Sequence, residues 1–118
     1  MDLKLTIYKE SEKGGLVVDR VVRNNSAFVP LKVFTRLTQL INMDELPDTV
    51  DKMALLKIVG KIAFGSLNEL NTILVLAFAE DGLKEEELEN CDPAEMIRCV
   101  VDMLISSFRS KFADLLGG

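Results

Sequence analysis

Residues 92–115, DPAEMIRCVVDMLISSFRSKFADL, carry the strongest helix signal in the chain. Asp92 can cap a helix through its side chain, Pro93 suits the first helical position, and Glu95 places an acid in the first turn. Apolar residues then recur at intervals of one, three or four, namely Met96, Ile97, Val100, Val101, Leu104, Ile105, Phe108, Phe112 and Leu115. This pattern predicts one amphipathic helix from about Pro93 to Leu115.

Helical patterns also precede this segment. Apolar spacings of three and four predict helices over residues 30–42 and 49–64, although Gly60 weakens the second by about 1 kcal/mol. Gly65 separates it from a very apolar helix around residues 70–78, which Ser66 and Glu69 would open as a capping box. Residues 83–90 predict a short helix or helical turn before Asp92.

The N-terminal residues follow a different period. Leu3, Leu5 and Ile7 alternate with polar residues, which predicts a half-buried strand. Gly14 and Gly15 suit a turn, and the β-branched residues of 16–22 predict a second strand. Together the two strands predict a hairpin with a loop longer than two residues. Such a hairpin needs helices or another chain to pack against.

These elements define an α+β, mainly α protein: an N-terminal β-hairpin followed by a bundle of about four to five helices. The chain has 118 residues, of which 48% are hydrophobic, so we expect a single domain over residues 1–118. The hairpin occupies residues 1–23 of it and the helical bundle residues 26–118.

Composition excludes much chemistry. The chain has no His, and its two cysteines, Cys91 and Cys99, lack the CxxC spacing, so we expect reduced thiols and no metal site. No phosphate-binding loop motif occurs, and no cofactor is expected. The net charge of −5 disfavours nucleic-acid binding. We therefore expect a binding module and not an enzyme.

Membranes are not expected as partners either. The longest uncharged apolar stretch, Leu70 to Ala79, is about half the length that a bilayer requires. The first ten residues carry charges throughout, unlike a signal peptide. The expected location is the cytoplasm.

Two surfaces are candidates for contacts with other chains. The end of the last helix extends beyond the expected bundle, so its apolar face either joins the core or binds a partner helix. The residues proposed for partner binding are Phe108, Phe112, Leu115, Leu104 and Met103. The hairpin edges could pair with those of a second copy and form a homo-oligomer, through the region of Leu3, Leu5, Ile7, Val17 and Val21.

From Ala27 onward, the order of features resembles the tail assembly chaperones of long-tailed (siphovirus-type) bacteriophages. The residues that carry the resemblance are Ala27-Phe28-Val29-Pro30 at a helix start, the helix ending Leu76-Ala77-Phe78-Ala79, the segment 80–88 (EDGLKEEEL), and the capped start Asp92-Pro93-Ala94-Glu95-Met96. The family often has a short β-rich N-terminus followed by such a helical array. This chain departs from it in the longer hydrophobic helix before Phe64.

The resemblance implies work without catalysis in the cytoplasm of an infected bacterium. Such chaperones bind the long, helical tape-measure protein, keep it soluble and help tail-tube subunits polymerise around it. They are absent from the mature virion. The alternative is a small helical adaptor or regulatory protein that binds a different protein partner.

Overall fold

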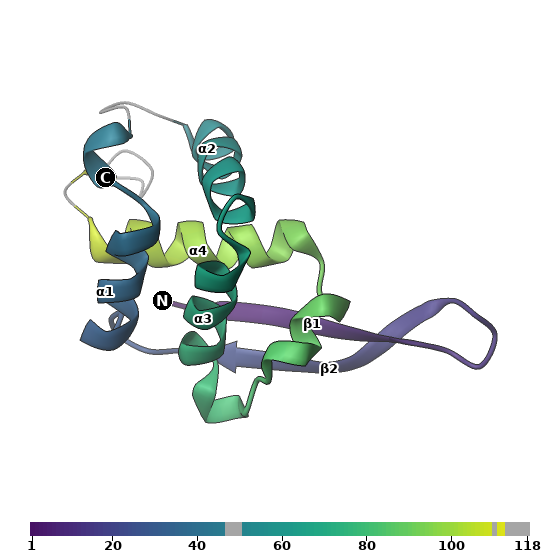
Figure 1. Ribbon diagram of the computed structural model, residues 1–118. Coiled ribbons are helices and arrows are strands. Elements are labelled where there is room, and N and C mark those ends of the chain that lie inside the picture. The colour runs from purple at the N-terminus through teal and green to yellow at the C-terminus, as the bar shows by residue number, and fades with distance from the viewer. Residues whose placement is uncertain (47–50, 110, 113–118) are drawn as a thin grey trace.

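The computed structural model describes residues 1–46, 51–109 and 111–112, and it contains a two-stranded antiparallel hairpin followed by four α-helices and short 3₁₀ turns (Figure 1). The expected fold class is therefore confirmed. In chain order the elements are β1 (Leu3–Glu10), β2 (Leu16–Asn24), α1 (Leu31–Leu40), η1 (Met43–Glu45), α2 (Lys52–Phe64), α3 (Leu67–Ala77), η2 (Ala79–Asp81), η3 (Glu85–Asn90) and α4 (Pro93–Ser107).

The hairpin forms where the period-2 pattern predicts it. Its loop closes through the Ser11 amide, which donates to the Gly15 carbonyl at 2.7 Å, and Gly14 adopts a φ of 86° that favours glycine. The register shifts between Ile7 and Tyr8, a bulge that separates the inner half of the hairpin from its tip. In Figure 1 the tip projects beyond the helices, and the longest dimension of the molecule is 48 Å.

One hydrophobic core joins the hairpin to the helices. Helix α4 lies at its centre, in contact with β1 and with α1, α2 and α3. The largest fully buried side chains come from both parts of the chain: Phe78, Leu3, Leu5, Ile7, Leu37, Ile41, Leu55, Leu70, Ile73, Leu74, Met103 and Leu104. The hairpin therefore finds among the helices the packing partner that an isolated hairpin lacks.

Two of the four α-helices, α2 and α4, begin at a side-chain cap. The Asp92 carboxylate accepts a hydrogen bond from the Ala94 amide at 2.9 Å, which confirms the predicted start of α4. Asp51 caps α2 in the same way through the Ala54 amide, at 2.7 Å. Pro30 is the N-cap of α1, one position before the one predicted for it.

Two predictions about helix ends are wrong. Helix α4 stops at Ser107, because Phe108 leaves helical geometry and its ring packs against Phe34 of α1, with centroids 5.5 Å apart. Of the predicted continuation, residue 110 and residues 113–115 lie outside the described residues. The capping box of α3 is also absent, since Ser66 makes no side-chain cap and the Glu69 carboxylate pairs with Arg36 at 3.6 Å.

Candidate partner-binding pocket

Helix α2 presents two adjacent stripes with different roles. Leu55, Val59 and Ala63 recur every four residues and are buried in the core. The next stripe along the helix surface, Leu56, Gly60 and Phe64, is not fully buried and lines a pocket. Because Gly60 has no side chain, the middle of this second stripe is hollow.

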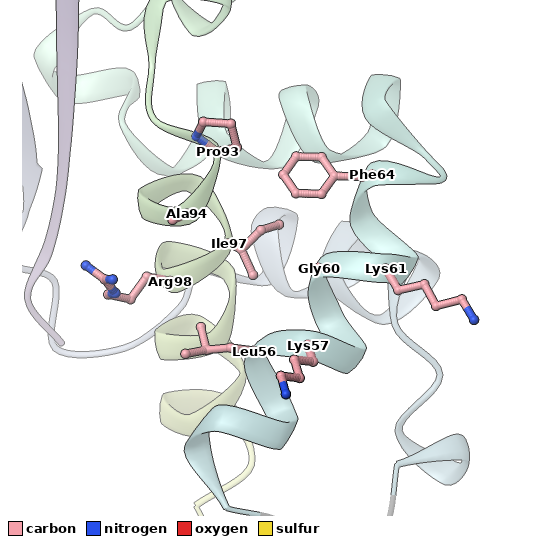
Figure 2. A pocket seen from close by; sticks show the side chains of 9 residues that line it. All are labelled: Leu56, Lys57, Gly60, Lys61, Phe64, Pro93, Ala94, Ile97 and Arg98. Atoms are coloured by element: carbon pink, nitrogen blue, oxygen red, sulfur yellow. The ribbon is translucent and has the colours of Figure 1, made fainter.

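The opposite wall of the pocket comes from the first turns of α4. Pro93 and Ala94 are small and exposed, whereas Ile97 is only 4% exposed and forms the apolar floor. A Cβ atom placed on Gly60 would lie 3.8 Å from the Ile97 side chain, so the two helices meet at this point. The resulting space has a volume of about 300 Å³ (Figure 2).

Contacts on either side of Gly60 show that α2 and α4 run in opposite directions. Lys52, at the start of α2, pairs with Asp102 in the second half of α4 at 3.7 Å. Phe64, at the end of α2, shares the pocket with Pro93 at the start of α4. The pocket therefore lies where the C-terminal end of α2 meets the N-terminal end of α4.

The rim of this pocket is cationic. Lys57 and Lys61 lie on the α2 side and Arg98 lies on the α4 side, with Phe64 and Ile97 between them (Figure 2). No Asp or Glu is among the nine residues that line the pocket, although the chain as a whole has a net charge of −5. An apolar floor with a charged rim is a typical arrangement for a ligand or partner site.

The sequence contains a signal for this pocket. Gly60, which by its helix propensity predicts only a weaker helix, interrupts an apolar stripe at a position flanked by Lys57 and Lys61. A glycine in such a stripe can mark a close approach or a hollow. Deciding between them required the position of α4.

The partner-binding face predicted at the end of α4 is mostly buried. Met103 and Leu104 are fully buried and Phe112 is 2% exposed, so these three residues follow the first of the two alternatives and join the core. For Phe112, the expected extension beyond the bundle is wrong. The physical reason is that α1, α2, α3 and β1 all pack around α4. Phe108 is half-buried against Phe34, and Leu115 lies outside the described residues.

The hairpin residues proposed for self-association divide into two groups. Leu3, Leu5 and Ile7 are buried and face the core, so they are not available to a second copy in this structure. Val17 and Val21 are 42% and 37% exposed. The accessible apolar side chains that the prediction required therefore lie on β2, with Val17 beyond the bulge and Val21 before it.

Both inner edges of the hairpin are covered by other elements. On the β1 edge, the Thr6 amide donates to the Glu95 carboxylate, and Ile7 forms an isolated antiparallel bridge with Cys91. On the β2 edge, the Arg23 amide donates to the Asp81 carboxylate at 2.7 Å. These contacts occupy main-chain groups that an edge-to-edge dimer would use.

The two cysteines are free thiols in this structure, as predicted. Burial raises the pKa of Cys91 to about 11 and that of Cys99 to about 12, and nearby Glu95 adds to both shifts. The thiolate forms are therefore scarce at neutral pH, and low reactivity is expected.

The Arg20 side chain ties the hairpin to the segment between α3 and α4. Its guanidinium donates two hydrogen bonds to the Glu87 carboxylate, at 2.7 and 2.9 Å, and others to the carbonyls of Asp81 and Gly82. Hydrogen bonds from Arg20, with a smaller contribution from the Lys84 amide, lower the pKa of Glu87 to about 2. This contact positions the hairpin but touches no residue of the pocket.

We expect Arg20→Ala to lower the free energy of unfolding by about 1–2 kcal/mol at pH 7, the range for a bidentate ion pair that is partly exposed. Urea unfolding followed by circular dichroism measures this change. Arg23→Ala is the control, because no side-chain hydrogen bond or ion pair is found for Arg23 among the described residues. Equal losses in both variants would contradict the assignment.

The same pair predicts a pH dependence. The pKa of Glu87 is lower in the folded chain than its ordinary value of 4.5, so its contribution is complete above about pH 4.5 and is lost as the pH falls towards about 2. Glu87→Gln should remove this part of the acid destabilisation when unfolding is measured between pH 5 and pH 2. An unchanged pH profile in that variant would assign the effect to other carboxylates.

Within residues 1–46, 51–109 and 111–112, no group of three or more His, Cys, Asp or Glu side chains could hold a metal ion. No helix formed by those residues combines the length and the apolar character that crossing a bilayer requires.

In comparison with known proteins, no family model matches this chain, and no curated protein or solved structure is significantly similar to it.

Proposed function

We propose that this protein is a non-enzymatic tail assembly chaperone of a long-tailed bacteriophage, and that it binds an apolar helical segment of the tape-measure protein in the pocket between α2 and α4. By covering that segment it keeps the tape-measure protein soluble in the host cytoplasm while tail-tube subunits polymerise around it.

The pocket is the observation that carries the proposal. It combines an apolar floor, a hollow at Gly60 and an exposed aromatic side chain, Phe64, at one end. A single apolar side chain of a partner helix fits a space of about 300 Å³. Burying such a side chain contributes about 1.5–3 kcal/mol to binding, which makes it an anchor for helix-in-groove recognition.

The choice of partner is supported by the resemblance in residues 27–96. A β-rich N-terminus followed by a helical array is the arrangement that the resemblance implies, and the fold has this arrangement. The net charge of −5 favours solubility of a complex that contains an apolar partner.

The test is a pull-down with a helical fragment of the tape-measure protein encoded in the same genome, where the chaperone gene should lie between the tail-tube and tape-measure genes. Gly60→Leu fills the pocket and should lower the retained fragment at least about tenfold, because the anchor side chain loses its burial. Gly60→Ala is the matched control at the same position, since it leaves most of the space open.

Both substitutions favour helix formation, so neither weakens α2 itself. Thermal unfolding of each variant verifies this point. Failure of the unmodified chain to retain the fragment, or equal retention by the Leu and Ala variants, contradicts the proposal.

A further inference from the structure

The charge of the pocket rim is opposite in sign to that of the protein. Lys57, Lys61 and Arg98 flank the apolar floor, and the lining includes no carboxylate. In Figure 2 the two lysines extend from α2 and Arg98 extends from α4 on the other side of Ile97. The charged end of Arg98 extends away from Ile97 in this view, so an anionic group at the edge of the pocket would meet the lysines of α2 first.

The two lysines lie four residues apart on α2, so they share one face of the helix. Like charges at this spacing repel each other and disfavour the helix. Among the residues that the structure describes, no ion pair is found for either lysine, whereas Lys52 on the same helix pairs with Asp102. A bound anion would relieve this repulsion, for which the described residues provide no ion pair.

Arg98 is less available than the two lysines. It also lines a neighbouring pocket with Asp2, Glu95 and Asp102. Burial raises the pKa of Asp102, and the positive charges of Lys52 and, to a smaller extent, Arg98 partly oppose that shift. The attraction for a partner's anions therefore comes mainly from the α2 side.

We propose that the pocket selects a partner helix in which an apolar anchor is flanked by carboxylates one turn apart. The anchor lies over Gly60 and Ile97, and the two carboxylates pair with Lys57 and Lys61. Residues four apart on a helix are separated by about 6 Å along its axis, so a Glu-x-x-x-Glu spacing matches that of the two lysines. This inference rests on the proposed function for a helical partner, and it adds the sign and spacing of that partner's charges.

The test uses two synthetic helical peptides of 18 residues with the same leucine anchors, one flanked by glutamates and the other by lysines. Fluorescence anisotropy measures their binding to the full chain at low salt. Each exposed ion pair changes affinity by up to about fivefold, so two pairs should make the glutamate peptide bind up to about 25-fold more tightly. High salt should reduce the difference.

Reversing the charge of the rim should reverse the preference. The variant Lys57→Glu/Lys61→Glu should bind the lysine peptide more tightly than the glutamate peptide. Lys32→Glu is the control, because Lys32 is an exposed lysine of α1 outside the pocket, and this variant should keep the original order. Gly60→Leu should weaken both peptides.

Three results would overturn the inference: equal affinities for the two peptides, a preference unchanged by charge reversal, or no peptide binding together with self-association that depends on Lys57 and Lys61. The last result would make a second copy the occupant. If the glutamate peptide binds as expected but the tape-measure fragment does not, the proposed function fails and this inference stands. If the charge-reversed variant retains the fragment fully at low salt, the proposed function stands and this inference fails.

Discussion

Phe78→Ala is expected to lower the free energy of unfolding by about 3–5 kcal/mol, the cost of removing a buried phenylalanine and leaving a cavity. Phe78 is fully buried at the C-terminal end of α3. Its carbonyl also accepts hydrogen bonds from the amides of Asp81 and Leu83, so its position fixes the turn that follows. Because small domains have about 5–15 kcal/mol of total stability, the variant should be close to unfolding.

Urea unfolding followed by circular dichroism measures this loss. The matched control is Phe28→Ala, since Phe28 is 70% exposed and its truncation should change stability by less than about 0.5 kcal/mol. A loss below about 1 kcal/mol for Phe78→Ala would show that α3 does not pack as described.

Leu104→Asp is expected to prevent folding. Leu104 is fully buried at the centre of α4, and the substitution removes apolar contacts and also buries a carboxylate without a partner. The lost contacts cost about 2–5 kcal/mol and the buried carboxylate adds several kcal/mol more, so the total is comparable to the whole stability of a small domain. Thermal unfolding and size-exclusion chromatography should show a chain without a cooperative transition.

Leu31→Asp is the control for this substitution, because Leu31 is 77% exposed at the start of α1. Its stability should stay within about 0.5 kcal/mol of that of the unmodified chain. The contrary result would be a Leu104→Asp variant that folds normally and loses only partner binding. That result would make this face of α4 the free surface that its sequence pattern first indicated.

Helix α4 shows which features its sequence could predict and which it could not. The capping by Asp92 and the amphipathic spacing from Met96 onward depend on local chemistry, and both were predicted correctly. The number of elements that pack around the helix depends on tertiary contacts, which a periodic pattern does not contain. Four elements surround α4, so side chains that appeared surplus in the sequence are core residues.

The hairpin shows the same division. Alternation in residues 3–8 identified β1 and the face that packs against the helices. It could not show that Glu95 and Cys91, about 90 residues away in the chain, cover the edge of that strand. Edge pairing between two copies needs free main-chain groups, and the contacts of Thr6, Ile7 and Arg23 occupy part of both edges.

The pocket could not be predicted as a site, although each of its walls could. The helical pattern placed Gly60 and the two lysines on α2, and the cap at Asp92 placed Pro93 and Ala94 at the start of α4. The site arises because the two helices run in opposite directions. This arrangement places Gly60 of α2 beside Ile97 of α4, in a pocket that Pro93 and Ala94 also line. Antiparallel packing of two helices separated by about 30 residues is a property of the whole fold.

Amide chemical-shift mapping of the full chain, on addition of the tape-measure fragment, tests the central claim most directly. If the pocket between α2 and α4 is the binding site, the largest shifts fall on residues 56–64 and 93–98, and those of α1 and the hairpin tip stay small. Shifts that concentrate on the hairpin tip or on α1, with residues 56–64 unchanged, would contradict the claim.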